Sequence, residues 1–417
     1  MSDTARCRLC GGHRLSRLFS LNDLPISHYL RKDLRDPDPR FTVDFESCQT
    51  CGLLQIVDAI PADLIYGDAD TYTTGFQQPK HLGDLITTTV ARQDPAKAID
   101  VGCNDGTLME ALCRSGYTLV VGVEPNPIAA RTAREKGHDV YTSYLTRELA
   151  AQIVADHGEF DTVYLRHVVE HVSELETFFA AIRTLLRADG FLVVELPEVE
   201  EAFKLGSPAV LWEEHVSYFT PAHAEYMLES HGFHICDRRQ YVFGGGSIAF
   251  VAQMKAVPAA PAGCMLKIPE PSSTIELLRR FTAELERQQA ELKGLVSLAR
   301  SAGFQVLIYG AAPRSCLLLS VCQISGMIDF VVDDRQDIQR RLMPGTQQFV
   351  RSLEEVAGTT GGKLLCLLGV GSENEFKVRA RIEALIDADL AFVSLFPPRN
   401  TLESVAQARG AIVASQT

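Results

Sequence analysis

Two cysteine pairs near the start of the chain constrain its fold more than any other feature. They read Cys7-Arg-Leu-Cys10 and Cys48-Gln-Thr-Cys51, and a glycine follows each pair. Four thiolates on two tight turns are the donor set of a tetrahedral zinc site with no position open for water. A redox pair would stand alone on a βα turn, whereas here two matched pairs occur together. The spacing therefore predicts one structural Zn²⁺ that folds a small lobe and does no chemistry itself.

Composition and charge exclude several classes of protein. The chain has 417 residues, of which 46% are apolar and 22% charged, so we expect a globular protein of two to four domains. No apolar run reaches the roughly 18 residues of a membrane span, and the first residues lack a hydrophobic signal core, which favours a cytoplasmic location without membrane contact. A net charge of −13 disfavours nucleic acid as the main partner. The expected partner is therefore a small-molecule substrate, and the oligomeric state is either a monomer or a homodimer.

Alternating strand-like and helix-like segments predict an α/β protein. The expected organisation is a zinc-binding substrate lobe at 1–75, a cofactor domain at 76–256, a proline-rich linker at 257–272, and a helix plus a Rossmann-like α/β domain at 273–417. The helix is expected over 273–300, with an apolar stripe of Leu278, Phe281, Leu285, Leu292 and Leu295.

A glycine-rich turn in the second domain predicts a nucleotide-like cofactor. An apolar strand runs into Gly102-Cys-Asn-Asp-Gly106, a helix follows, and the next strand ends at Glu124-Pro125. Glycines let the backbone approach a ligand, and a carboxylate after the second strand binds ribose hydroxyls. A dehydrogenase prefers G-x-G-x-x-G, which is absent, so the turn favours S-adenosylmethionine (SAM). The residues expected to contact it are Gly102, Asn104, Asp105, Gly106, Glu124, Pro125, His167 and His171.

The strands that follow support the same cofactor. They are expected at Phe160–His167, Gly190–Pro197, Phe233–Tyr241 and Ser247–Met254, and the last two form a hairpin joined by glycines. A hairpin that closes an otherwise parallel sheet is the seven-strand pattern of class I methyltransferases. The fold class is therefore a class I, Rossmann-like core between the zinc lobe and a second Rossmann-like domain.

Two histidine-bearing segments carry candidate chemistry. Glu214 and His215 lie with Trp212 and Tyr218 after the fifth strand, where open α/β sheets bind ligands. A histidine beside a carboxylate is the usual composition of a general base. The segment from His167 to His171 has the H-x-x-E-H spacing of an inverted zinc-protease motif, which requires a helix. Because a strand is expected to end at about Val168, we expect cofactor contacts here and no second metal.

The chain resembles the three-domain sugar C-methyltransferases of deoxysugar biosynthesis in its motifs and their order. The motifs are the two cysteine pairs, called the zinc knuckles below, followed by G-C-N-D-G, G-V-E-P-N and E-H-V-S-Y-F. Those enzymes methylate the carbon next to a ketone on a nucleotide-linked sugar. The resemblance implies that His215 is the base, that Glu214 orients it, and that Tyr218 supports the site. It also implies a tyrosine from the zinc lobe, matched to Tyr72, with Tyr66 as second choice. Gly245-Gly-Ser resembles the family's G-G-S turn near the active site.

Three departures from that family keep other functions open. Members typically carry alanine and histidine where this chain has Glu170-His171. They have a G-A-A-x-K-G-N turn where this chain has Gly310-Ala-Ala-Pro-Arg-Ser-Cys. They have a W-N pair where this chain has Ser372-Glu-Asn. The C-terminal differences put the nucleotide-sugar substrate in doubt more than the chemistry. The alternatives are an O- or N-methyltransferase of a small metabolite, a dehydrogenase, and a non-catalytic SAM- or NAD-binding protein with a zinc-ribbon interaction module.

Overall fold

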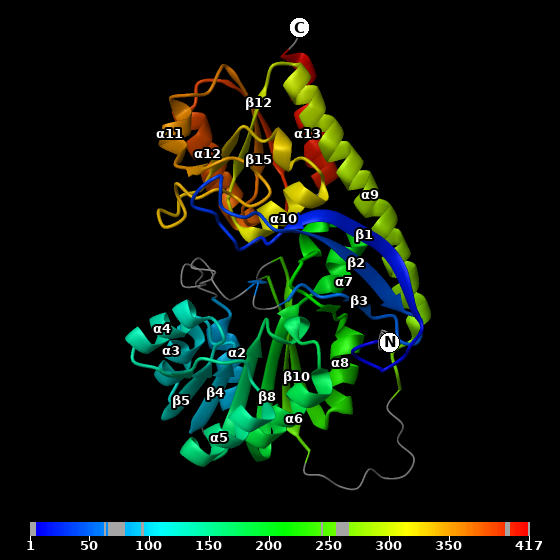
Figure 1. The fold of residues 1–417 in the computed structure, drawn as a ribbon, viewed down its shortest axis with the longest axis vertical. Coiled ribbons are helices and arrows are strands. Elements are labelled where there is room, and N and C mark those ends of the chain that lie inside the picture. The colour runs from blue at the N-terminus through cyan, green and yellow to red at the C-terminus, as the bar shows by residue number, and fades with distance from the viewer. Residues whose placement is uncertain are drawn as a thin grey trace.

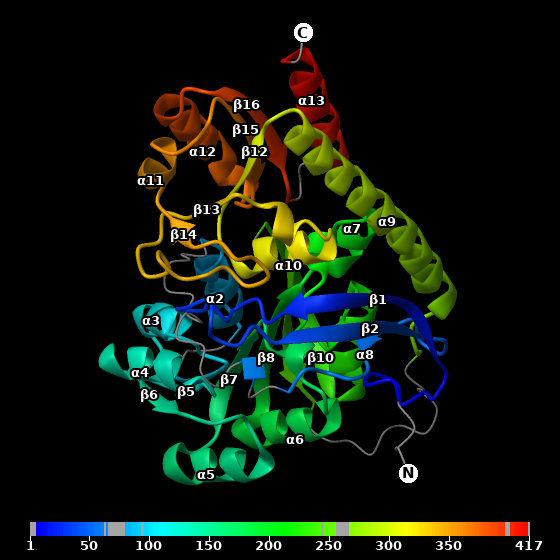
Figure 2. The same ribbon diagram turned by 45° about the horizontal axis from the view of Figure 1, so that its top comes forward.

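Three β-sheets organise the chain (Figure 1). The computed structural model describes residues 6–61, 64–65, 80–92, 96–242, 245–255, 267–396 and 401–415. The N-terminal sheet lies between two α/β units, and a long helix runs along one side of the N-terminal sheet and the C-terminal unit (Figure 2). Among the helices described, none combines the length and apolar character needed to span a bilayer.

The N-terminal lobe is a small antiparallel sheet completed by a distant segment. Its strands are β1 (Leu15–Pro25), β2 (Arg40–Cys48), β3 (Leu54–Ile56) and β9 (Ser217–Tyr218), in that order. Strand β9 pairs antiparallel with β3, with Leu54 opposite Tyr218. Since β9 begins two residues after His215, the zinc lobe is joined through its sheet to the segment that carries the expected base.

The middle sheet has seven strands in the order β10-β11-β8-β7-β4-β5-β6. The strands are β4 (Lys97–Val101), β5 (Leu119–Val123), β6 (Asp139–Tyr141), β7 (Phe160–Arg166), β8 (Leu186–Pro197), β10 (Phe233–Tyr241) and β11 (Ser247–Met254). Strand β11 is antiparallel to β8 and β10, while the other pairs are parallel. This is the predicted closing hairpin, and the expected class I methyltransferase core is confirmed.

Helices and short turns cover both faces of this sheet. They are α2 (Leu82–Val90), α3 (Thr107–Arg114), α4 (Pro127–Glu135), α5 (Arg147–His157), η1 (Val169–His171), α6 (Leu175–Leu185), α7 (Val199–Lys204), η2 (Pro208–Val210) and α8 (Pro221–Ser230). Helix α4 begins where the Asn126 side chain accepts from two backbone N–H groups and Pro127 fixes the first turn. Such caps hold the loops at the carboxyl ends of the strands, where the cavity described below lies.

The C-terminal unit is a second parallel sheet, in the order β14-β13-β12-β15-β16. Its elements are β12 (Gln305–Tyr309), α10 (Pro313–Val321), η3 (Ser325–Met327), β13 (Phe330–Val332), β14 (Val350–Arg351), α11 (Leu353–Ala357), β15 (Lys363–Leu368), α12 (Ser372–Leu385), β16 (Asp389–Ser394) and α13 (Thr401–Ala414). The expected Rossmann-like domain is confirmed, although the two-residue strand β14 is too short to predict.

Helix α9 (Pro271–Ser301) connects the domains. The first part of its predicted stripe packs with the lobe, where Leu278 and Phe281 share a core with Phe45 of β2. The later part, including Leu292 and Leu295, belongs to the core of the C-terminal unit. Burial of one continuous stripe against two domains explains why so long a helix is stable.

Candidate active site

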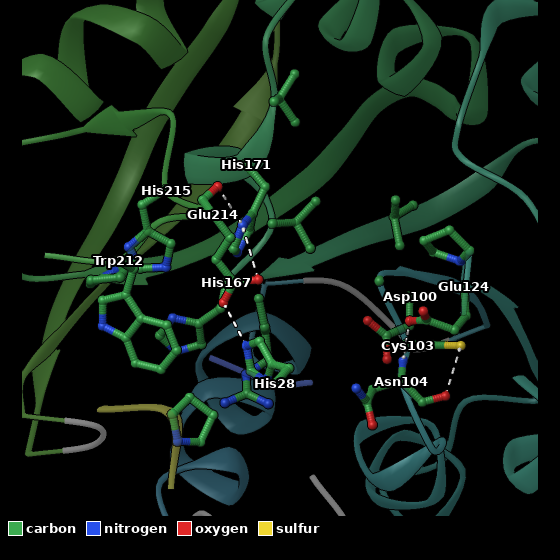
Figure 3. A pocket seen from close by; sticks show the side chains of 18 of the residues that line it. His28, Asp100, Cys103, Asn104, Glu124, His167, His171, Trp212, Glu214 and His215 are labelled. Atoms are coloured by element: carbon green, nitrogen blue, oxygen red, sulfur yellow. Dashed lines mark hydrogen bonds and ion pairs between the residues drawn. The ribbon is translucent and has the colours of Figure 1, made fainter. Parts of the chain in front are cut away.

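One cavity of about 720 Å³ is lined by all three parts of the chain. The lobe contributes His28, the middle domain contributes the glycine turn and both histidine segments, and the C-terminal unit contributes Arg314 and Arg335. Figure 3 shows His171, Trp212, Glu214 and His215 on one side of the cavity and Asp100, Asn104 and Glu124 on the other. Its volume lies within the range of small-molecule sites, about 300–1,000 Å³.

The two cysteine knuckles converge as predicted. The Sγ atoms of Cys7 and Cys51 lie 3.6 Å apart, as do those of Cys10 and Cys48, and all four lie within 4.8 Å of one another. Sulfur atoms about 2.3 Å from one zinc ion in a tetrahedron are roughly 3.8 Å apart, so the cluster fits Zn²⁺. Each turn is closed by a positive-φ glycine that donates back to the first cysteine of its pair, Gly11 in one and Gly52 in the other.

The glycine turn has the shape expected of a nucleotide cradle. Gly102 has φ +79°, and a Cβ there would lie 2.5 Å from a methyl carbon of Val168. Glu124 accepts backbone N–H bonds from Asn104 at 2.9 Å and from Asn126 at 2.8 Å. Burial raises the pKa of Glu124 and these bonds oppose that shift. Gly102, Asn104, Glu124 and Pro125 all line the cavity, so the buried Glu124 carboxylate lies beside the glycine turn, as the predicted ribose contact requires.

Asp105 and Gly106 are not among the lining residues described, although both were expected to contact the cofactor. The Asp105 carboxylate accepts from the hydroxyl of Thr107 at 2.8 Å, and Gly106 is the N-cap of α3 at φ +81°. A Cβ on Gly106 would lie 2.8 Å from the ring of His138. Both residues therefore shape the turn rather than face the cavity.

His215 is buried and held by aromatic contacts at the other side of the cavity. Its ring stacks on Trp212 at 5.4 Å and 14°, and His171 meets it edge-on at 4.9 Å. Burial lowers the pKa of His215 to about 4, and the charge of His171 acts in the same direction. Among the residues that the structure describes, neither ring nitrogen of His215 has a hydrogen-bond partner. The neutral imidazole therefore presents its lone pair to the cavity.

The Glu214 carboxylate joins the site to the zinc lobe. It accepts a hydrogen bond of 3.1 Å from His28 Nε2, and its Oε2 lies 3.9 Å from His171 Nδ1. Burial would raise the pKa of Glu214, but the charges of His28 and His171 lower it below its usual range. Glu214 therefore stays ionised. No pattern in the sequence indicated His28, because 186 residues separate it from its partner.

The expected tyrosines have different outcomes. The Tyr218 hydroxyl accepts from Trp212 N–H at 3.0 Å and donates to the carbonyl of Trp212 at 2.9 Å. Tyr218 therefore fixes the turn that carries Trp212 and His215 and is not among the lining residues described. Tyr72 and Tyr66 lie outside the described residues.

His167 and the glycine hairpin share one buried carboxylate, Glu195. Glu195 accepts hydrogen bonds from Arg166 at 2.6 Å, Ser247 at 2.6 Å and His81 at 2.8 Å. Burial alone would lower the pKa of His167, but Glu170 and Glu195 raise it to about 9. His167 lines the cavity with φ +52°, a conformation that non-glycine residues seldom adopt outside functional sites. Gly245 and Gly246 also line the cavity, as the G-G-S resemblance implied.

Three family models match consecutive parts of the chain. They are described as "Putative zinc binding domain" over residues 7–66, "Methyltransferase domain" over 76–237 and "C-methyltransferase C-terminal domain" over 243–392. "C-methyltransferase NovU" of Streptomyces niveus is 28% identical over 84% of this chain and 86% of its own length. The chain belongs to the three-domain SAM-dependent C-methyltransferases.

Other relatives of this methyltransferase match a smaller part of the chain. "Ubiquinone biosynthesis O-methyltransferase, mitochondrial" of Bos taurus is 31% identical over 36% of this chain and 46% of its own length. Among solved structures, a Burkholderia thailandensis 1,6-didemethyltoxoflavin-N1-methyltransferase gives a TM-score of 0.36 at 15% identity, covering 50% of this chain and 97% of that one. The assignment as a SAM-dependent methyltransferase excludes the dehydrogenase and non-catalytic alternatives.

Proposed function

We propose that this C-methyltransferase methylates the carbon next to a ketone on a nucleotide-linked deoxysugar, with His215 as the general base. One observation supports the proposal above all others. His215, with no hydrogen-bond partner among the described residues, lines the same cavity as the Gly102 turn and Glu124. A base and a SAM cradle that open into one closed space are what methylation of an acidic C–H requires.

The chain's own residues supply position and proton transfer. SAM, when bound, supplies an electrophilic methyl group. His215 takes the proton from the carbon beside the ketone, and Glu214 and Glu170 provide negative charge that stabilises the imidazolium formed. Trp212 stacking and the Tyr218 clamp hold the ring in one orientation. The base is therefore pre-positioned, and general base catalysis of this kind contributes about 10²–10⁴-fold.

The C-terminal unit supports a phosphorylated substrate. Arg314 and Arg335 of this unit line the cavity, and the Arg314 guanidinium lies 4.2 Å over the ring of Phe396. Guanidinium groups are suited to phosphate oxygens because they offer several donors in a fixed plane. A diphosphate-linked sugar would place its ketone toward His215 and its phosphates toward these arginines. None of the ten described cysteines forms a disulfide, which supports the further proposal of a cytoplasmic location.

Exchange of the α-proton tests the proposal directly. Nucleoside-diphosphate-linked 4-keto and 3-keto deoxysugars are incubated with enzyme and S-adenosylhomocysteine in D₂O, and deuterium in the sugar is measured by mass spectrometry. We expect deuterium at one carbon beside the ketone, lost in His215→Ala while calorimetric SAM affinity is kept. A variant that exchanges at the wild-type rate would refute the base assignment.

Transfer to oxygen or nitrogen is the second candidate, favoured by the relation of the middle domain to O-methyltransferases. It shares the cofactor turn and could use the same histidine. No deuterium at carbon in the experiment above, together with a product methylated on oxygen or nitrogen when SAM is supplied, would support this candidate over C-methylation.

A further inference from the structure

Three side chains beside the cavity form a cluster that the proposed reaction does not need in full. One oxygen of Glu170 and one ring nitrogen each of His171 and His215 lie within 4.8 Å of one another. The H-x-x-E-H spacing pointed to no metal because it needs a helix, and the structure has only the short turn η1 there. The cluster is a different donor set, which takes two residues from η1 and the third from the segment before β9.

Glu170 is the most unusual member of this cluster. It is 2% exposed, and neither carboxylate oxygen has a hydrogen-bond partner among the described residues. Its one ion pair brings His167 Nδ1 to 3.5 Å from Oε1. Burying an anionic oxygen without a partner is costly, and each such group calls for an explanation. A cation bound beside His171 and His215 would give the second oxygen a partner.

His171 is held by a hydrogen bond of the kind that orients metal-binding histidines. Its Nδ1 donates to the backbone carbonyl of Glu214 at 3.1 Å, which places the proton on that nitrogen. Metal-binding histidines usually donate their other N–H to a carbonyl or carboxylate in this manner. The His215 ring is held by Trp212 and makes no hydrogen bond within the described residues.

We propose that Glu170, His171 and His215 bind a divalent transition metal such as Zn²⁺, and that this metal inhibits the enzyme. One carboxylate and two imidazoles are a common donor set for such ions, with a fourth position open to water. The cavity gives the ion an entry path. Because the metal takes the lone pair of His215, it blocks the base. The inhibition rests on the proposed function, whereas the binding does not.

Cobalt binding tests the site without any substrate. Protein that retains its knuckle zinc is titrated with CoCl₂, and bound cobalt is counted after dialysis. The matched variants are Glu170→Gln and Glu174→Gln, since the Glu174 carboxylate is 71% exposed on the rim of the same cavity. We expect one cobalt per chain in the wild type and in Glu174→Gln, with visible bands but no thiolate charge-transfer band, and about tenfold or greater loss of affinity in Glu170→Gln. Equal binding in all three proteins, or none in the wild type, would overturn the site.

Zinc titration of the deuterium-exchange reaction tests the inhibition. We expect ZnCl₂ to suppress exchange in the wild type and in Glu174→Gln, and to require at least about tenfold more zinc in Glu170→Gln. Full exchange in a cobalt- or zinc-loaded wild type would overturn the inhibitory role. Absence of exchange even without added metal would instead count against the proposed function, and the cobalt count would still decide the site. Circular dichroism and one bound zinc per chain verify that Glu170→Gln is folded.

Discussion

Replacing Glu195 by glutamine tests whether one buried carboxylate holds the middle domain and the cavity together. Glu195 is fully buried and accepts from His81 at the start of α2, Arg166 at the end of β7 and Ser247 at the start of β11. Glutamine has nearly the same shape but carries an NH₂ group in place of one oxygen. That group would face a donor, and Arg166 would lose its counter-charge.

The expected loss follows from the burial of the pair. Removing one partner of a buried ion pair destabilises a protein by about 3–5 kcal/mol, because the other charge stays desolvated. At roughly 2–4 °C per kcal/mol for a domain of this size, the melting temperature should fall by about 6–20 °C.

The stabilisation that Glu195 provides depends on pH. Burial would raise the pKa of Glu195, but His167, His81 and Arg166 lower it well below its usual range. The stabilisation is therefore present above the unfolded-state value of about 4.3 and is lost as pH falls further. The difference between wild type and Glu195→Gln should be largest near pH 7 and narrow below about pH 5.

Calorimetry of the middle-domain transition measures the effect. Glu176→Gln is the matched control because its side chain is 87% exposed on α6 of the same domain, and a change within about 0.5 kcal/mol is expected there. Adding Arg166→Met to Glu195→Gln should recover part of the loss by removing the stranded charge. If Glu195→Gln and Glu176→Gln have the same melting temperature at pH 7, the reasoning about this network is refuted.

Three further changes probe the zinc lobe, the cofactor turn and its support. Cys48→Ser should abolish zinc binding, measured by mass spectrometry, and expose the lobe to proteolysis; one zinc per chain with wild-type melting would contradict this. Burial raises the pKa of Asp100 to about 7, so ionisation of Asp100 makes the wild type less stable as pH rises from about 4 to 7. The melting temperature of Asp100→Asn, compared with that of the wild type, should therefore be higher at pH 8 than at pH 5. In Gly122→Ala the new Cβ would lie 2.6 Å from Cys103 Sγ, so a loss of about 1–3 kcal/mol and weaker SAM binding are expected in urea unfolding and calorimetry.

The features that were predicted correctly from the sequence are those encoded by short-range patterns. The knuckles, the glycine turn and the hairpin strands β10 and β11 each depend on residues close together in the chain, and the boundaries of the hairpin strands are as predicted. Buried parallel strands are continuous apolar runs, so both α/β units could be predicted from the sequence.

The parts that were missed depend on contacts between distant segments. His28 meets Glu214 across 186 residues, and His81 meets Glu195 across 114. No periodicity encodes such pairs. A signal existed for Glu170, which follows Val168 and Val169 and forms part of the H-x-x-E-H spacing from His167 to His171. Local composition therefore showed which residues could do chemistry, but not which of them meet.

The position of the zinc knuckles gives them a larger role than folding a separate lobe. Cys48 ends β2 and Cys51 lies in the turn between β2 and β3, and β3 pairs with β9, which begins two residues after His215. The carbonyl of Cys51 also accepts a 2.8 Å hydrogen bond from His223 in α8, on the other side of the base. A metal that fixes Cys48 and Cys51 thereby fixes two attachments that flank His215. Zinc loss should therefore misalign the base while the Gly102 turn, on a different sheet, still binds SAM.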